Sequence, residues 1–373
     1  MAKYVYIRTM EANIIFKEDW KVLTRFLPPG WMKMGRELGA FKRSRGFKSV
    51  NVLLRILLIH LADSCSLRQA TARAKLGNIA DVSDVALLKR LKSSSKWLQW
   101  MTLELIKVNG ISLTPPAWLK NYFIKSVDAS VVSEPGSTGT DWRLHYSLDL
   151  FSLSCNQFII SRPDVGESFI NFKVQEKDLL LGDRIYGRLK GLCYVKDNGG
   201  DFIARFKTKA FSLSKQGEDF ELAKELAVLN FGEVGNWDLE GYTKSGLSLS
   251  IRLCAIRKTE EETEKSIKKA KRAASKQCRK LSAESLELCK YVILVTSLPN
   301  TISAQLILEL YRFRWQVEIV FKRLKSILGF GHLPKKEEDS CRAWLQGKLF
   351  VAQLSQRIVN EGRFFSPWGY PIK

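Results

Sequence analysis

The sequence predicts an α/β protein in which a mixed β-sheet carries helices on its faces and follows a helical N-terminal region. Apolar residues first recur at helical steps and then, beyond a pair of prolines, alternate with period two. Strand patterns next alternate with helical ones, and hairpins followed by crossover connections imply a mixed sheet. With 373 residues and 45% hydrophobic content, the chain is long enough for two or three folded domains.

Residues 1–118 form the predicted helical region. One helix opens at Ser66, where Gln69 completes a capping-box pattern, and Gly77 can close it. A second helix is predicted from about Ser83 over the residues up to 108. Two helices rich in Lys and Arg suit a helix-turn-helix reader of DNA, although their connection is longer than usual, and a purely structural bundle is the alternative. The prolines of "TPPAW" (114–118) mark a linker.

The sheet is predicted from residues 119–207 and 288–340. Period-two patterns predict a strand that ends near Asp128 and strands over 142–150 and 157–162. A buried strand is predicted to end at Asp183, and a further strand is predicted over 199–207. Helices are predicted at 166–177 and 186–198. "YVILVTSLP" adds a buried strand, and the absence of Gly and Pro from 304 to 328 predicts one helix after it. The element order is therefore β-β-β-α-β-α-β-α, and residues 341–373 form a C-terminal helical tail.

Residues 208–287 differ in character from the segments on either side. The stretch 225–258 predicts a β-meander with glycine turns. Residues 257–280 carry ten Lys or Arg against four Glu, which suits either a solvated helix or a flank that faces DNA.

Bulk composition narrows the class of partner. Lys and Arg outnumber Asp and Glu by 60 to 38, which gives a formal charge of +22 and favours a polyanion, either nucleic acid or an anionic membrane surface. The longest apolar run is interrupted by Arg55 and His60, and the N-terminus lacks a secretory signal, so we expect a cytoplasmic protein outside the membrane.

Cysteine and histidine usage limits the metal chemistry. The seven cysteines form no C-x-x-C pair and there are only three histidines, so neither a zinc site nor a disulfide framework is indicated. Any metal must be held by carboxylates, which favours Mg²⁺ or Mn²⁺.

One carboxylate lies within a basic, aromatic helix. At about 100° per residue, Tyr311, Arg314, Glu318 and Lys325 share one face. The simple explanation is an i,i+4 ion pair between Arg314 and Glu318, worth a few tenths of a kcal/mol.

Two aspartates end apolar strands, Asp128 and Asp183. A charge at the end of a buried strand costs free energy unless it is paired, solvated or bound to metal. Each alone could be a turn or capping residue. Together with Glu318 they form a set.

This set resembles the RNase H-like polynucleotidyl transferases, in which two strands and a following helix each deliver one carboxylate. More closely, the chain is similar to the DDE transposases of the insertion-sequence-four family. Their signature is Tyr, two residues, Arg, three residues, Glu, six residues, Lys, and it is matched by Tyr311, Arg314, Glu318 and Lys325. Further matches such as "GDRIYG" and "ILVTSLP" spread the resemblance over about residues 60–355. This family inserts a β-rich domain where residues 208–287 lie.

The resemblance implies a DNA transposase that cuts and rejoins DNA by a cut-and-paste route, with a hairpin intermediate expected. Asp128, Asp183 and Glu318 would hold two Mg²⁺ or Mn²⁺ ions, with Asp128 bridging them. The residues expected to contact DNA are Tyr311, Arg314, Lys325, Lys322, Arg323 and Tyr291. For the last of these, stacking on a flipped base is weighed against ordinary packing at a strand end.

The resemblance also implies the partners and the location. They are double-stranded DNA at terminal inverted repeats, target DNA and a second subunit in a homodimeric synaptic complex, within the nucleoid of a bacterial cytoplasm. Two alternatives are a catalytically inactive DNA-binding relative and a structure-specific nuclease of the same fold.

Overall fold

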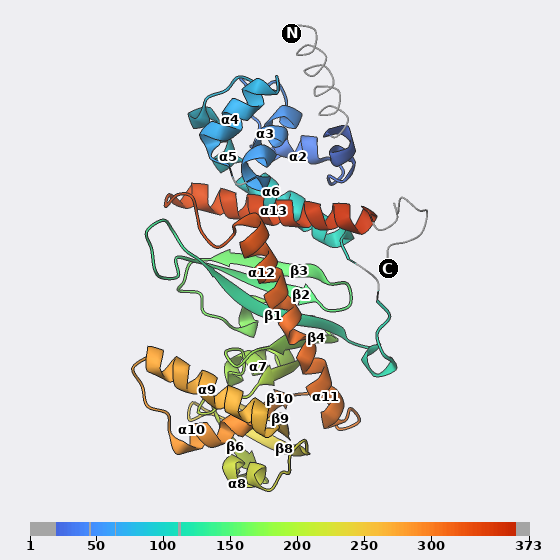
Figure 1. The fold of residues 1–373 in the computed structure, drawn as a ribbon. Helices are drawn as coiled ribbons and strands as arrows, with labels where there is room; N and C mark the ends of the chain where they lie inside the picture. The colour runs from blue at the N-terminus through green and yellow to red at the C-terminus, as the bar shows by residue number, and fades with distance from the viewer. Residues whose placement is uncertain (1–19, 45, 64, 111–112, 363–373) are drawn as a thin grey trace.

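The structure is a computed structural model that describes residues 20–44, 46–63, 65–110 and 113–362. A layer of helices lies above a long mixed sheet, and one helix runs from that layer down the face of the sheet (Figure 1). The helices of the upper layer are α2 (Trp31–Glu37), α3 (Val50–Ala62), α4 (Leu67–Leu76), α5 (Asp84–Ser93), α6 (Ser95–Val108) and α13 (Glu338–Gly362).

The N-terminal helices begin and end largely where the sequence predicts. Helix α4 has the predicted capping box between Ser66 and Gln69 and ends at Gly77. The predicted helix from about residue 83 is wrong in one respect, because it is two helices that meet at Ser94. The Ser94 hydroxyl donates a hydrogen bond to the carbonyl of Arg90 at 2.7 Å. Ser94 is the middle of three consecutive serines, and serine hydroxyls that bond to nearby backbone groups compete with a continuous helix.

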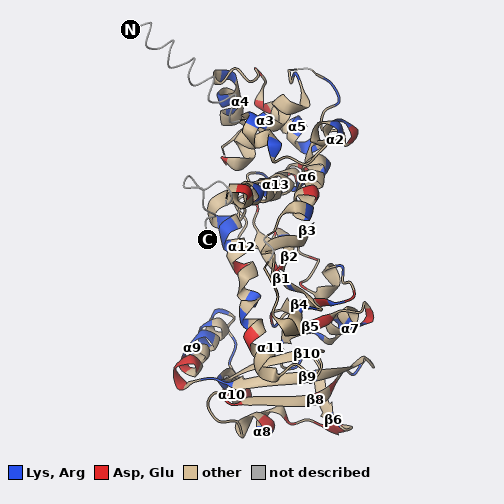
Figure 2. Ribbon diagram, turned by 90° about the vertical axis from the view of Figure 1, so that its right-hand side faces the viewer, with Lys and Arg blue, Asp and Glu red and all other residues tan. Residues whose placement is uncertain are grey.

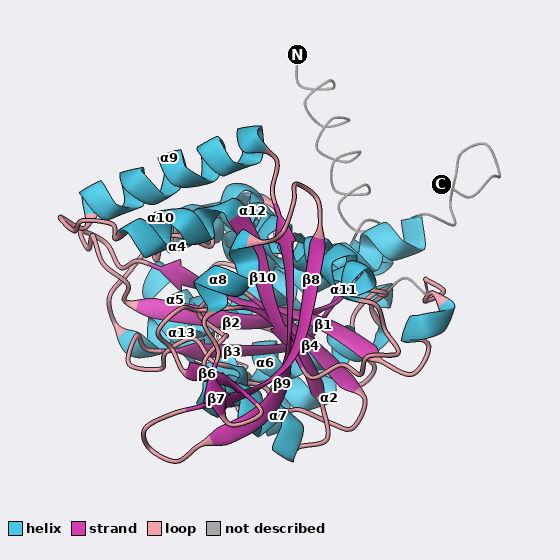
Figure 3. Cartoon of the chain, turned by 90° about the horizontal axis from the view of Figure 1, so that it is seen from below, coloured by secondary structure: helices cyan, strands magenta, loops and turns pink. Residues whose placement is uncertain are grey.

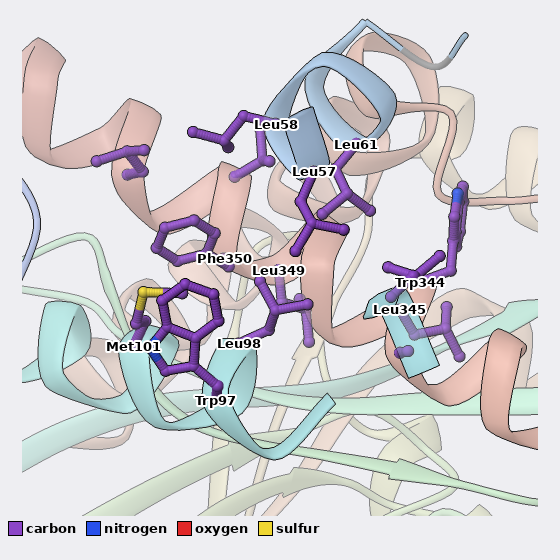
Figure 4. Close-up of a cluster of buried hydrophobic side chains, with 14 of the residues drawn as sticks. Leu57, Leu58, Leu61, Trp97, Leu98, Met101, Trp344, Leu345, Leu349 and Phe350 are labelled. Carbon is purple, nitrogen blue, oxygen red and sulfur yellow. The ribbon is translucent and has the colours of Figure 1, made fainter. Parts of the chain in front are cut away.

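The C-terminal helix α13 packs into the N-terminal region. Side chains from α3, α6 and α13 interdigitate in one hydrophobic cluster (Figure 4), and the labelled members are Leu57, Leu58, Leu61, Trp97, Leu98, Met101, Trp344, Leu345, Leu349 and Phe350. Asn109 at the end of α6 donates to the carbonyl of Gln353 at 2.9 Å. The two ends of the chain therefore build one helical layer.

One ten-stranded sheet runs through the rest of the described chain, in the order β3-β2-β1-β4-β5-β10-β9-β8-β6-β7. Strand β1 pairs antiparallel with β2 and parallel with β4, and β4 pairs parallel with β5. The sheet is therefore mixed, as predicted. Its strands are β1 (Phe123–Val132), β2 (Trp142–Asp149), β3 (Ser154–Ser161), β4 (Asp178–Gly182), β5 (Asp201–Arg205), β6 (Ser212–Lys215), β7 (Glu218–Asp219), β8 (Val234–Tyr242), β9 (Ser248–Arg257) and β10 (Tyr291–Thr296).

The strands of the β-rich segment continue this sheet. Strand β9 pairs antiparallel with β10, so β8, β6 and β7 follow outward from the core strands. The predicted meander begins too early, because residues around Leu226 form the short helix α8 (Leu222–Ala227) and bury that leucine. The basic run forms α9 (Glu260–Lys276), which lies with α10 (Ala283–Glu287) along one side of the sheet (Figure 3).

Successive side chains of a buried strand serve opposite faces of the sheet. In β4, Leu180 belongs to the cluster under α7 (Leu189–Asp197), whereas Leu179 and Leu181 belong to the cluster under α11 (Ala304–Tyr311). The predicted helix at 166–177 is wrong, and only a 3₁₀ turn, Phe169–Asn171, forms there. Phe169 and Phe172, three residues apart, are both buried in the α7 cluster and hold this tighter turn.

The predicted helix over 304–328 is interrupted. It consists of α11, a 3₁₀ turn at Arg312–Trp315, and α12 (Gln316–Leu328). The Ser126 hydroxyl of β1 donates to the carbonyl of Arg314 at 2.8 Å. A sheet residue thus contacts the backbone where the helix tightens, which periodicity alone does not reveal.

Two further findings cover all of the described residues. All seven cysteines lie in the described part of the chain and are free thiols. No helix of the described residues is both long enough and apolar enough to cross a membrane.

Candidate active site

Two aspartates converge at the carboxyl end of β4. In the parallel pair β1 and β4, Ser126 lies opposite Leu181. This register directs Asp128, two residues further on, toward Asp183, whose charge contributes to a raised pKa of Asp128. The prediction that a strand ends near Asp128 is wrong, because β1 continues to Val132 and pairs with β2 beyond Asp128. Only its pairing with β4 stops before this point, and Asp128 lies within range of the charge of Asp183.

Gly182 makes the sharp exit from β4 possible. A Cβ at this position would lie 2.6 Å from the Cβ of Tyr186 and 2.8 Å from the ring of Phe169, which is closer than carbon atoms approach. The chain therefore turns at once after Asp183, whose carboxylate accepts the backbone amide of Ile185 at 2.7 Å.

The 3₁₀ turn Arg312–Trp315 and the start of α12 form the second part of the candidate site. The Arg314 guanidinium lies 5.8 Å from the centre of the Tyr311 ring and donates to Glu318 at 2.5 Å. Tyr311, Arg314 and Glu318 therefore form a contiguous series, and the predicted i,i+4 pair is present. In Figure 2 the ribbon of α12 carries both the colour of the acidic residues and that of the basic residues along its length.

Electrostatics link this series to the sheet. Burial raises the pKa of Asp128 to about 7, and the negative charge of Asp183 adds to this while Arg314 opposes it. Burial likewise raises the pKa of Tyr311 to about 12, against the positive charges of Arg314 and Arg205. The two aspartates, Arg314 and Tyr311 thus lie within range of one another's charge.

Sequence reasoning missed two neighbours of the aspartates. Glu167, whose carboxylate lies 3.6 Å from Arg143, also raises the pKa of Asp128. The hydroxyl of Tyr186 is buried without a hydrogen-bond partner, and its pKa is raised by burial and by the charges of Asp128 and Glu167. Glu167 lies in the segment between β3 and β4, and Tyr186 lies between β4 and α7. Neither belongs to a strand or an α-helix, so no periodic pattern in the sequence marks them.

The other residues predicted to contact DNA do not lie beside the two aspartates. Lys322, Arg323 and Lys325 are exposed on α12, and Lys325 lies two turns, about 10 Å, beyond Glu318. Tyr291 is the first residue of β10 and is only 2% exposed, packed in the cluster under α7.

Comparison with known proteins agrees with this architecture. The family model for the transposase DDE domain matches residues 165–354, a span that contains Asp183 and Glu318. The InsL protein of insertion sequence element IS186A from Escherichia coli strain K12 is 31% identical over 342 residues, which cover 89% of this chain and 91% of that protein. The transposase for insertion sequence element IS421 from Escherichia coli is 31% identical over 343 residues, with the same shares.

The chain belongs to the DDE transposase family. A more distant relative is the transposase for insertion sequence element IS231B from Bacillus thuringiensis subsp. berliner, 24% identical over 381 residues that cover 90% of this chain and 78% of that protein. The protein is accordingly a transposase, a polynucleotidyl transferase enzyme of an insertion sequence. Transposases of this class act on DNA and generally use divalent metal ions.

The transposase offers two carboxylates that fit a divalent cation. Asp128 and Asp183 are hard oxygen donors, and a cation between them would oppose the rise that the charge of Asp183 causes in the pKa of Asp128. Glu318 is in a different state, since its carboxylate is paired with Arg314. Within the described residues, no three His, Cys, Asp or Glu side chains are arranged as a metal site.

Proposed function

We propose that this transposase cleaves DNA at the ends of its own insertion sequence and joins them to target DNA by metal-dependent strand transfer, and that it belongs to the insertion-sequence-four group. The observation that supports this most is that Asp128 lies within range of the charges of Asp183 and of Arg314, the residue paired with Glu318. The spacing of Tyr311, Arg314, Glu318 and Lys325 supports the group.

In this proposal Asp128, Asp183 and Glu318 hold Mg²⁺ or Mn²⁺, taken to be two ions. When bound, such ions activate an attacking oxygen and stabilise the leaving one in displacement at phosphorus. The side chains around them position the DNA. Arg314, once released by Glu318, donates charge-assisted hydrogen bonds to the phosphate, and the Tyr311 hydroxyl donates another.

The exposed basic side chains of α12 extend the proposed contact with DNA. Lys322, Arg323 and Lys325 would bind phosphates further along the duplex. We propose terminal inverted repeats and target DNA as the substrates, a homodimer as the assembly that pairs two ends, and a hairpin as the intermediate of a cut-and-paste route. DNA reading by α4 and α5, and base stacking by Tyr291 after a rearrangement that exposes it, belong to the same proposal.

The test is cleavage of DNA that carries the element's own ends, in Mg²⁺ or Mn²⁺, by the wild type and by Glu318→Gln. We expect the variant to bind DNA and to lose cleavage by at least about a hundredfold, because the amide keeps the size of the side chain and removes the charge. Joining of the cut ends to a target plasmid, assayed in the same reaction, separates strand transfer from simple nuclease activity.

Glu309→Gln is the matched control. Glu309 lies on α11, is exposed and accepts a hydrogen bond from Gln305, so the same chemical change there leaves cleavage intact. If Glu318→Gln cuts as well as the wild type, Glu318 serves only as the partner of Arg314, and the proposed role is wrong.

A further inference from the structure

An apolar groove of about 600 Å³ lies where the chain between α6 and β1 passes α11. The turn between β2 and β3 and the 3₁₀ turn after α11 complete its lining. Three of its apolar side chains are exposed, Leu113 by 48%, Leu153 by 41% and Phe313 by 55%. They share this concave surface with the half-buried Trp118 and Leu306. Single exposed apolar residues are ordinary, whereas a concave set of them is suited to an apolar partner.

Leu153 has an unusual backbone conformation for its side chain. Its φ is 51°, in the left-handed region, where a Cβ crowds the backbone and glycine or asparagine is favoured. The side chain is nevertheless large, apolar and exposed at the groove. Neither the turn nor contact with water favours leucine here, so a partner that covers the side chain accounts for it best.

The last turns of α13 lie close to this groove. Arg357 donates to the carbonyl of Val108 at the end of α6, at 3.2 Å. Two residues after Val108, a Cβ at Gly110 would lie 2.9 Å from the Cβ of Ser152. Ser152 is in the turn between β2 and β3, and its two neighbours in the chain both line the groove. One short stretch of chain therefore contacts α13 on one side and the rim of the groove on the other.

Residues 363–373, which follow α13, have the composition of an apolar partner. Their sequence is "RFFSPWGYPIK", and its aromatic members are Phe364, Phe365, Trp368 and Tyr370. Aromatic side chains bury large apolar areas when they enter a groove. Gly362 lies only about 8 Å along the helix from Arg357, at 1.5 Å per residue, and an extended segment of this length reaches up to about 36 Å. The groove is therefore within reach of residues 363–373.

Residues 1–19 also lie outside the described chain, but they leave it at a different place. The indole of Trp20 donates to the side chain of Asn51 on α3 at 2.8 Å. In Figure 1, α6 and α13 lie between α3 and the sheet, whereas the groove is built on α11 and the sheet side of that layer. Of the two segments, residues 363–373 are the ones that start beside the groove.

We propose that residues 363–373 dock in this groove of their own chain through their aromatic side chains. The docked segment covers Leu153 and Phe313 and removes the exposed apolar surface at both. Phe313 belongs to the 3₁₀ turn that also carries Arg314, so the segment contacts the turn that forms part of the candidate site. The inference is independent of the proposed function, because docking requires neither DNA nor metal.

The experiment is limited digestion of the full-length protein with chymotrypsin, which cuts after Phe, Trp and Tyr. Intact mass measures the rate of cleavage within residues 363–373, and a synthetic peptide of the same sequence gives the rate for an undocked segment. We expect cleavage in the protein to be slower than in the peptide by at least about tenfold, because a docked segment is cut only while it is out of the groove.

Two substitutions weaken the groove without touching the buried core. Leu153→Asn places a residue that suits the left-handed backbone, and Phe313→Ser changes a side chain that is already 55% exposed. Phe231→Ser is the matched control, since Phe231 is also 55% exposed but lies outside the groove. We expect each groove variant to raise the rate of cleavage within residues 363–373 by at least about threefold, and the control to leave it unchanged. Thermal unfolding checks that each variant remains folded.

Cleavage of the wild type at the rate of the peptide would overturn the proposal, because the segment would then be undocked. Slow cleavage that neither groove variant accelerates would place the segment elsewhere and overturn it as well. The digestion is repeated over a series of protein concentrations. Protection that is independent of concentration supports docking within one chain, whereas protection lost on dilution would assign the groove to residues 363–373 of a second copy and overturn the assignment to the same chain.

Discussion

Lys348 is a charged residue at the centre of the helical layer. Its side chain has no exposed surface, and its ammonium lies 5.1 Å from the centre of the Trp344 ring. Burial lowers the pKa of Lys348 from 10.5 to about 8. Between these two values the unfolded chain binds a proton that the folded protein does not, so the free energy of unfolding rises with pH over that window, by up to about 3 kcal/mol.

The prediction is a comparison of Lys348→Met with the wild type by urea unfolding from pH 7 to pH 10.5. The variant should be the more stable protein at pH 7, and the difference should shrink as pH rises through 8. A difference that stays constant over this range would show that Lys348 does not titrate within it.

At the scale of elements, the contact between α13 and α3 depends on one glycine. A Cβ at Gly347 would lie 2.6 Å from two methyl carbons of Leu61, which is itself fully buried. Gly347→Ala should therefore destabilise the protein by about 1–3 kcal/mol through overpacking, although alanine favours a helix by about 1 kcal/mol. Thermal unfolding of the purified variant measures the balance.

Gly362, the last residue of the same helix, provides the control. No atom of the described residues lies within 4 Å of a Cβ built there, so Gly362→Ala should cost nothing and can add slightly to stability. Equal effects at both positions would mean that propensity, and not the contact with Leu61, decides the outcome.

At the scale of the whole molecule, the N-terminal helices depend on the C-terminal one. The cluster that includes Leu57 and Trp97 also includes Leu349, and Arg357 of α13 donates to the carbonyl of Val108 at 3.2 Å. A chain that ends at residue 337 should therefore lose hydrogen-exchange protection throughout α3 and α6. Core strands such as β4 and β10, buried between α7 and α11, should keep theirs in the same sample and serve as the internal reference.

Undiminished protection of α3 and α6 in that shortened chain would mean that residues 20–110 form a core of their own. The predicted boundary at residue 118 would then mark an independent unit. In the structure the boundary separates the helical layer from the sheet along the chain, but the layer closes only when α13 returns to it.

Local elements were largely predictable because their signals lie within a few residues of one another. Period-two alternation placed β1 and β2, a buried apolar run placed β10, and the pairing of Ser66 with Gln69 placed the start of α4. The failures lie where a distant residue decides the conformation. Ser126 contacts the carbonyl of Arg314 at the 3₁₀ turn, and the burial of Phe169 replaces a predicted helix with a turn.

The sequence by itself determined the basic charge of the protein, the order of most strands and helices, and the residue types that could bind metal and phosphate. These follow from composition, periodicity and spacing, which are properties of neighbouring residues. Only the tertiary structure decided that Asp128 and Asp183 lie within range of each other's charge and that α9 closes a basic pocket against the sheet. These arrangements bring together segments that lie far apart in the chain. Only the packing of the complete core brings such segments together.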